Sequence, residues 1–238
     1  MKLESLTIAQ LRDLDEINPD LAFVARRLLA PAAGYEEWVN VLELDLLQCV
    51  KFLEEDPLIR RKDGEDRLTA DLIGNLRSRA YDASHDEKVG GHADIVVRNP
   101  KGYLWLGEAK IHASYDYLLQ GFNQLCTRYS RGTPEADRGA LIIYTRVADV
   151  AAVVERWREY VKAQGITDFE AADCSIRKEH AFRSSHRHKS GGRPYRVWHL
   201  GVVLHCEPDD KKQKSGAAAP SVATAAAPAA NSSAKLAS

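Results

Sequence analysis

The stretch "GGHADIVVRNPKGYLWLGEAKIH", residues 90–112, decides the fold, because it reads as two strands joined by a tight turn. The apolar runs "DIVV" and "YLWL" flank the turn "NPKG". A three-residue loop with its glycine in the left-handed conformation closes a common type of hairpin, and this loop pairs Asn99 with Tyr103. The sequence therefore predicts an antiparallel hairpin with a defined register.

One face of this hairpin carries three charged residues. The same register sets Asp94 opposite Glu108, and residues directly opposite share a face of a sheet. Lys110, two residues beyond Glu108, shares that face as well. Opposed carboxylates repel each other, but a divalent cation such as Mg²⁺ reverses the sign of that interaction and leaves room for water and phosphate. A lysine beside the metal can orient or deprotonate an attacking water, as phosphodiester hydrolysis requires.

A structural interpretation of the same residues stays open. Glu108 and Lys110 would then form a surface salt bridge at a strand end, and Asp94 would cap a turn. His92 shares the face of Asp94 and either is a solvated residue at the strand edge or supports the site residues. The surrounding sequence favours the metal site, because an acidic helix start at Glu65 precedes the hairpin and a glutamine-bearing helix follows it.

The elements around the hairpin predict an α/β fold. Helical periodicity covers residues 7–30, with Thr7 as N-cap and a break at Asn18-Pro19, and Pro31 to Gly34 end that region. The remaining expected elements are helices at 35–56, 64–80, 113–129 and 148–165, and strands at 139–145, 169–176 and 195–205. This order predicts a mixed sheet with helices packed on it.

Three regions follow from this pattern. Residues 1–60 form a helical N-terminal region, and residues 61–206 form the α/β core. Residues 207–238, rich in Ala and Pro, contain no aromatic residue and only one Val and one Leu, so we expect them to be disordered.

Composition narrows the class of protein. The chain has 238 residues, 45% of them apolar and 28% charged, and a net charge of −1, so any contact with nucleic acid must come from a local patch. The four cysteines lie far apart without CxxC spacing, which suits a reducing cytosol rather than a zinc knuckle or a disulfide framework. With no signal peptide and no long apolar run, we expect a cytoplasmic protein without a membrane partner.

These motifs resemble the PD-(D/E)XK nuclease superfamily, which has a restriction-endonuclease-like fold. The matching residues are "GHAD", ending at Asp94, and "GEAK", ending at Lys110, with thirteen residues between Asp94 and Glu108. The proline of the family name is Ala93 here. The resemblance implies a mixed β-sheet core flanked by helices, Mg²⁺ or Mn²⁺ held by Asp94 and Glu108 with Glu65 completing the site, and a water positioned by Lys110.

The implied activity is metal-dependent hydrolysis of nucleic acid, of DNA more often than RNA, in bacterial defence or repair. The alternative is a catalytically silent module on the same fold that binds nucleic acid or a protein. The chain contains no P-loop or dinucleotide motif, so an ATPase or a target reader would be a partner protein. A homodimer is compatible with cutting both strands, because that usually takes two sites.

Two further groups of residues are candidates for contacts with nucleic acid. Gln120 and Gln124 share a helix face and could hold the attacking water, although Gln124 is followed by Arg128 and then Tyr129, one residue out of the QxxxY pattern of some exonucleases. Residues 177–196 hold seven Lys or Arg against one acidic residue and read as a long loop. The loop is either solvated or a phosphate clamp. The clamp residues would be Arg183, Arg187, Lys189 and Arg193.

Overall fold

The structure of the chain is a computed structural model that describes residue 10 and residues 19–208. The predicted helix over residues 7–18, with Thr7 as its N-cap, falls outside the described residues apart from residue 10. The disorder predicted for the tail likewise concerns residues that are not described, from 209 onward. The described residues up to Cys206 belong to one compact unit.

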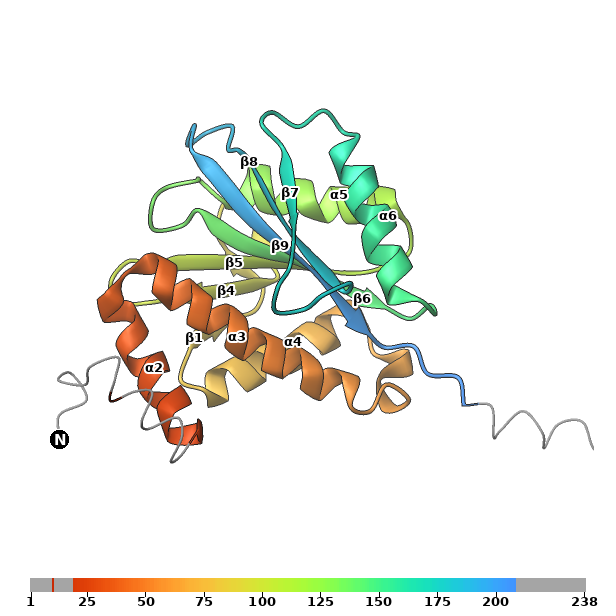
Figure 1. Ribbon diagram of the computed structural model, residues 1–238, viewed down its shortest axis with the longest axis horizontal. Helices are drawn as coiled ribbons and strands as arrows, with labels where there is room; N and C mark the ends of the chain where they lie inside the picture. The colour runs from red at the N-terminus through yellow and green to blue at the C-terminus, as the bar shows by residue number, and fades with distance from the viewer. Residues whose placement is uncertain (1–9, 11–18, 209–238) are drawn as a thin grey trace, which may run out of the picture. The chain divides into compact units, whose positions relative to one another are not determined.

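A seven-stranded mixed sheet organises this unit (Figure 1). Across the sheet the strands run β1 (Asp82–Ser84), β4 (Ile95–Arg98), β5 (Leu104–Ile111), β6 (Arg138–Thr145), β9 (Pro194–Val203), β8 (Ala181–Arg187) and β7 (Glu170–Asp173). The central strands β5, β6 and β9 are parallel, and the outer pairs are antiparallel. Two short strands, β2 (Glu87–Lys88) and β3 (His92–Ala93), form a separate ribbon.

Helices cover both faces of this sheet (Figure 1). One face carries α3 (Tyr35–Glu54) and α4 (Glu65–Ser78), with α2 (Pro19–Ala33) packed on α3 and a 3₁₀-helix, Ile59–Lys62, between α3 and α4. The other face carries α5 (Tyr115–Asn123), a π-helix, Gln124–Tyr129, and α6 (Val150–Lys162). Each face buries its own apolar core, so the α/β class predicted from the sequence is confirmed. None of the described helices is long and apolar enough to cross a membrane.

The hairpin has the predicted register. Its strands pair Ile95 with Gly107 and Arg98 with Leu104, and the Asn99 amide donates to the Tyr103 carbonyl. Gly102 has a φ of 84°, the left-handed conformation that the three-residue loop requires. Extending this register by one residue places Asp94 at the level of Glu108.

Three predictions about elements were wrong. The stretch 177–196 is not a long loop, because β8 occupies Ala181–Arg187 and β9 begins at Pro194. The strand is polar in sequence, but its polar groups find distant partners, such as the Ser184 hydroxyl at 2.8 Å from His199 Nε2. The short strands β1 and β2 were also missed. Pro31 does not end α2, which continues to Ala33 before Gly34, with a φ of 122°, breaks the helix.

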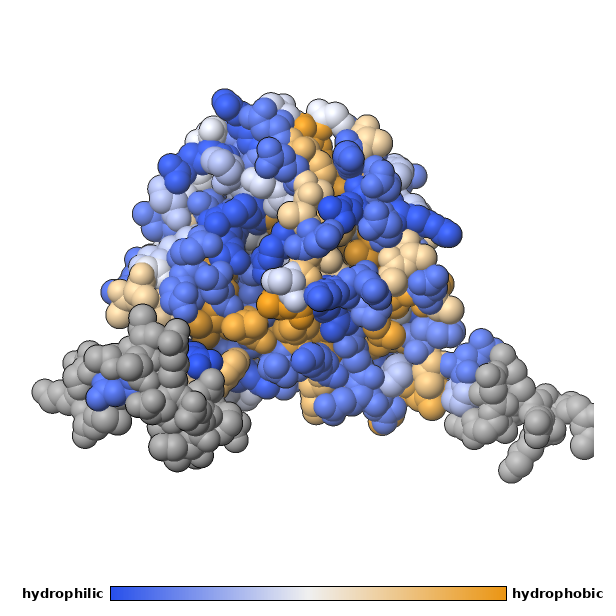
Figure 2. Space-filling model, in the orientation of Figure 1, coloured by the Kyte–Doolittle hydropathy of each residue, from blue (hydrophilic) through white to orange (hydrophobic). Residues whose placement is uncertain are grey.

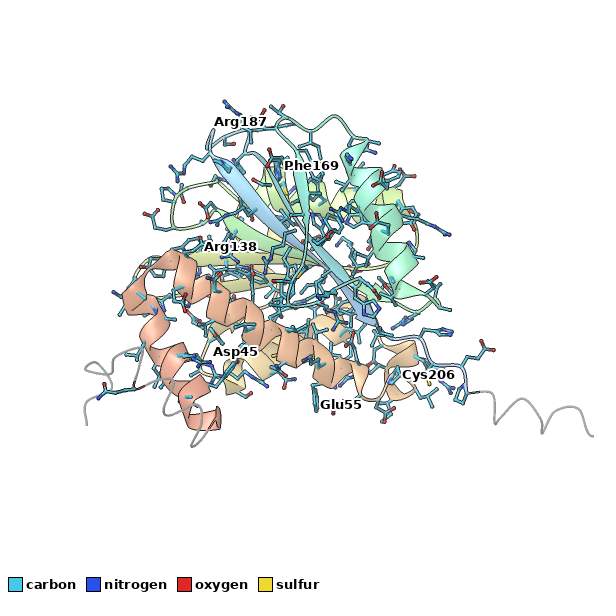
Figure 3. The ribbon with its side chains drawn as sticks, in the orientation of Figure 1. Asp45, Glu55, Arg138, Phe169, Arg187 and Cys206 are labelled. Carbon is cyan, nitrogen blue, oxygen red and sulfur yellow. The ribbon has the colours of Figure 1, made fainter. Side chains whose placement is uncertain are left out.

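A buried carboxylate ties the first helices together. Asp45, on α3, is fully buried and accepts two hydrogen bonds of 2.7 Å from the Arg27 guanidinium of α2 (Figure 3). Tyr81, a residue that follows α4, donates a third hydrogen bond of 2.7 Å to Asp45 through its hydroxyl. Because a buried charge is tolerated only when it is paired, this cluster fixes how the segments meet.

Buried histidines lie in the core under α5 and α6. His186 packs against the Phe122 ring, with centroids 5.4 Å apart, and His199 Nδ1 accepts a 3.0 Å hydrogen bond from the Trp157 indole. Burial lowers the pKa of His186 to about 4, with His188 adding to the effect, and burial lowers the pKa of His199 well below its ordinary value. Both imidazoles are therefore neutral at pH 7.

We expect these histidines to make the protein less stable in acid. In the unfolded chain His186 becomes protonated below its ordinary pKa of about 6.5, whereas in the folded chain it becomes protonated only near pH 4. Stability is therefore fully present above pH 6.5 and falls as the pH drops toward 4, by about 3 kcal/mol for His186 alone. Urea unfolding at pH 7, 5.5 and 4 measures the effect. His186→Leu should flatten the slope and exposed His92→Leu should not; equal slopes in both variants would contradict the assignment.

Candidate active site

Four residues predicted for the site converge at the C-terminal end of β5. The Lys110 Nζ atom lies 2.6 Å from Glu108 Oε1, 3.3 Å from Glu65 Oε1 and 3.6 Å from Asp94 Oδ2. Glu108 is 1% exposed and Lys110 6% exposed. Because Asp94 and Glu108 both contact the same ammonium, their carboxylates lie on the same side of the sheet, as the register predicts.

Two of these carboxylates complete the edge of β5. Strand β4 begins at Ile95, opposite Gly107, so β5 continues beyond its antiparallel partner. There the Asp94 Oδ2 atom accepts a 2.8 Å hydrogen bond from the Ala109 amide, and Glu65 Oε2 accepts one of 2.7 Å from the Ile111 amide. Asp94 and Glu65 thus take the place of a missing strand, and this holds their carboxylates beside Lys110.

Burial sets the electrostatics of the cluster. Burial, with the Asp94 charge adding to it, raises the pKa of Glu108 to about 8, against the opposing effect of Lys110. Burial lowers the pKa of Lys110, but Glu108, Asp94 and Glu65 together raise it more, so Lys110 stays protonated. Among the described residues, Glu108 Oε2 has no hydrogen-bond partner although it is buried. The cluster therefore has more negative charge than one ammonium neutralises.

Helix α5 closes the site through residues that the sequence analysis missed. A Cβ atom on Gly121 would lie 2.8 Å from Lys110 Cγ and 3.3 Å from Glu108 Cγ, so only glycine lets α5 approach this closely. The Tyr117 ring centroid lies 5.6 Å from Lys110 Nζ, and its hydroxyl donates to both Glu65 carboxylate oxygens at 3.4 Å. A glycine inside an amphipathic helix was the available signal, since it costs stability unless close packing requires it.

Substitution of Gly121 tests this close approach. We expect Gly121→Ala to lower the free energy of unfolding by about 1–3 kcal/mol, because the methyl group forces α5 away from Lys110. Gly74→Ala is the matched control, since Gly74 is also helical but its Cβ would meet open space. The free energy of unfolding of this control should rise by about 0.5–1 kcal/mol, because alanine has a higher helix propensity than glycine. Equal changes in urea unfolding of the two variants would refute the tight contact.

The π-helix that follows α5 changes the relation between Gln124 and Tyr129. Hydrogen bonds between residues five apart place these two residues one above the other, whereas an α-helix aligns residues four apart. Five residues of a π-helix therefore align much as four residues of an α-helix do, so Gln124 and Tyr129 are aligned although they are one residue further apart than in the QxxxY pattern. Tyr129 is buried, and burial raises its pKa, with Glu108 and Asp94 adding to the effect. A Cβ on Gly91 would lie 2.7 Å from its ring, so Tyr129 packs directly beside the strand that leads to Asp94.

Glutamines line a shallow cavity along the same helices. Gln120, Gln124 and Arg128 border a space of about 460 Å³. The Gln124 Oε1 atom is buried without a hydrogen-bond partner among the described residues. Gln124 therefore keeps an unused hydrogen-bond acceptor, and this acceptor is buried.

The predicted basic residues do not gather around Lys110. Arg183 contacts Glu43 of α3, on the sheet face opposite α5, and Arg187 pairs with Asp168 at 2.9 Å. Lys189 and Arg193 are exposed in the turn between β8 and β9, where Lys189 borders a cavity beside the π-helix. Arg187 borders the same cavity, so Arg187 and Lys189 are the two predicted basic residues that lie on the α5 side.

The donor set fits a hard divalent cation, although the lysine holds the central position. No group of three or more His, Cys, Asp or Glu within residues 19–208 is arranged to hold a metal ion. Mg²⁺ needs only one or two protein carboxylates, because it keeps several waters. Asp94 and Glu108 supply that number, and the unpartnered Glu108 Oε2 is a free oxygen donor.

The chain matches no family model, no curated protein and no solved structure. The functional conclusion therefore depends on the chemistry of the cluster around Lys110.

Proposed function

We propose that this chain is a metal-dependent nuclease that hydrolyses phosphodiester bonds, of DNA rather than RNA, on a restriction-endonuclease-like core. The observation that carries this proposal is the convergence of Glu65, Asp94 and Glu108 on Lys110 at one end of β5. A buried cluster with surplus negative charge and an unpartnered carboxylate oxygen is costly for a purely structural role. The same cluster is suited to a cation and a phosphate.

Asp94 and Glu108 would hold Mg²⁺, or Mn²⁺ in its place, and Glu65, which also contacts Lys110, would complete the site. When bound, the ion supplies Lewis acidity toward a phosphate oxygen and lowers the pKa of a coordinated water. A cation beside Glu108 favours the ionised form of this carboxylate, which burial otherwise disfavours. The β5 amides that bond to Asp94 and Glu65 keep these carboxylates in place.

Lys110 would act as a positioned cation. Its pKa lies above the ordinary value, so it is suited to orienting a water and to stabilising negative charge on the phosphate rather than to accepting a proton. Tyr117 would hold Glu65 and the ammonium in register, and the buried amide oxygen of Gln124 would accept a hydrogen bond from a water. A homodimer would supply a second site for cutting both strands. A partner protein would supply ATPase activity or target recognition.

One observation supports a second candidate, a module that binds nucleic acid or protein without cleaving. Lys110 already contacts all three carboxylates, so the cluster could be a structural ion-pair network. The two candidates differ in one measurable property, because only the nuclease requires a cation at Asp94 and Glu108.

Incubation with supercoiled plasmid and with a single-stranded RNA, in Mg²⁺ or in chelator, tests the proposal. We expect plasmid loss that depends on Mg²⁺ and disappears in Asp94→Asn. The exposed Asp82→Asn is the control. In parallel, Mg²⁺ should raise the unfolding temperature of the wild-type chain and not that of Asp94→Asn. Absence of both cleavage and stabilisation would leave the binding module.

A further inference from the structure

A cavity of about 530 Å³ lies on the sheet face opposite Lys110. Its floor is formed by β6, β8 and β9, and its sides by α3, β7 and the segment after β7. In Figure 2 apolar surface shows in the zone between α3 and the strands, with hydrophilic surface around it. The apolar side chains of the lining are those of Leu44, Ala172 and Ile176, whereas Ala171 and Val197 border the cavity from strands whose side chains at these positions face the other core.

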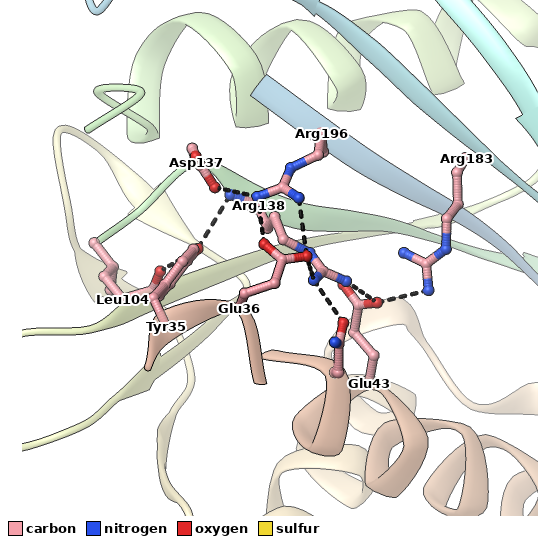
Figure 4. Close-up of polar contacts among 9 residues, drawn as sticks. Tyr35, Glu36, Glu43, Leu104, Asp137, Arg138, Arg183 and Arg196 are labelled. Atoms are coloured by element: carbon pink, nitrogen blue, oxygen red, sulfur yellow. Dashed lines mark hydrogen bonds and ion pairs between the residues drawn. The ribbon is translucent and has the colours of Figure 1, made fainter. Parts of the chain in front are cut away.

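Arginines from three strands meet carboxylates of α3 at the floor of this cavity (Figure 4). Arg138 donates to Glu36 at 2.9 Å and to Glu43 at 2.7 Å, and Arg196 contacts Glu36 at 2.8 Å. Glu43 is 1% exposed and also pairs with Arg183 at 2.7 Å. A buried, doubly paired carboxylate of this kind fixes the guanidinium groups that surround it.

Arg183 differs from the other two arginines because part of its guanidinium is unused. Only its Nη2 atom pairs with Glu43, and no hydrogen bond involves its Nε or Nη1 atom within residues 19–208. The guanidinium also lies 5.2 Å from the centroid of the Trp198 ring, which supports it from the strand β9. With 36% of its side chain exposed, Arg183 offers preorganised donors to the cavity.

Glu36 is the replaceable member of this cluster. It belongs to the first turn of α3, and its side chain is 58% exposed. When Glu36 turns to solvent, it frees one guanidinium edge on Arg138 and one on Arg196. An incoming oxyanion would then meet three arginines, while the buried Glu43 keeps them in position.

We propose that this cavity binds a small molecule that carries one oxyanion, carboxylate or phosphate, on an apolar body about the size of an aromatic ring. Arg183 anchors the oxyanion, since planar guanidinium donors match both kinds of oxyanion. Leu44, Ala172 and Ile176 contact the apolar body. The volume lies in the range of ordinary ligand sites. This site is independent of the nuclease proposal, because it lies on the other face of the sheet.

Four probes test the proposal by titration against the full chain, with protein NMR or calorimetry as the readout. Benzoate and phenyl phosphate carry ring and oxyanion, benzyl alcohol lacks the oxyanion, and inorganic phosphate lacks the ring. We expect at least one ring anion to bind tenfold more tightly than both benzyl alcohol and phosphate, and the preferred anion identifies the ligand class. Equal binding of ring anion and alcohol, or no binding of either ring anion, would overturn the proposal.

Variants locate the binding. Arg183→Gln should weaken the ring anion at least tenfold, whereas Arg187→Gln, on the same strand but outside the cavity, should not. Glu36→Gln should strengthen binding, because the resident carboxylate no longer competes. Ala172→Leu, directly opposite Arg183 in the strand register, should block the ring without touching an ion pair, which covers the case in which Arg183→Gln fails to fold. Unchanged affinity in Ala172→Leu would reject this cavity.

Discussion

Lys110→Met is expected to lower the rate of nucleic-acid cleavage by about 10²-fold or more while binding of the nucleic acid persists, as for loss of a group aimed at the reacting centre. Methionine fills most of the volume of the lysine side chain, so the contact with Gly121 is kept and only the charge is removed. Cleavage and electrophoretic mobility shift, measured on one preparation, separate the two effects. Lys101→Met, in the exposed turn of the same hairpin, is the control and should cleave normally.

The same variant carries a stability signature. Without the ammonium, Glu65, Asp94 and Glu108 repel each other, so the unfolding temperature in chelator should fall. Mg²⁺ should restore part of the loss, because a divalent ion compensates the same carboxylates. Normal cleavage by Lys110→Met would instead mean that the lysine is only an ion-pair partner, and the proposed mechanism would be wrong.

The second large effect concerns Asp45. Asp45→Ala is expected to lower the free energy of unfolding by about 3–5 kcal/mol, the usual cost of removing one partner from a buried ion pair. Arg27 loses both of its short hydrogen bonds and the buried Tyr81 hydroxyl loses its acceptor. Urea unfolding measures the change.

Asp82→Ala removes an exposed aspartate and should shift the urea midpoint little. A loss in Asp45→Ala no larger than in this control would show that the cluster contributes nothing to stability. Because Asp45 lies on α3, away from Lys110, the variant should keep its cleavage activity at temperatures where it remains folded.

Local sequence rules predicted much of the fold and the core of the site. The turn "NPKG" fixes the hairpin register by itself, and that register places Asp94, Glu108 and Lys110 on one face. Helices α3 and α4 follow from apolar periodicity, and the acidic start of α4 places Glu65 at the end of β5. These features depend on short-range geometry, which periodicity and turn chemistry report directly.

The features that were missed depend on contacts between distant segments. Strand β8 looks polar, but Ser184 is hydrogen-bonded to His199 and Arg183 pairs through one nitrogen with Glu43. No local rule anticipates these distant partners. The cavity beside Arg183 needs α3, β7 and β9 to meet. Tyr117 and Gly121 contact Lys110 only because α5 packs on β5 at that level.

The π-helix holds one residue more than an α-helix would need to align the same two positions. If a deletion removed the exposed Thr127 and the segment closed as an α-helix, Gln124 and Tyr129 would be four residues apart and would keep their alignment. Tyr129 would then stay on the side that packs beside Gly91. A single-residue deletion between Gln124 and Tyr129 should therefore be tolerated, whereas a further insertion would break the alignment and should be selected against.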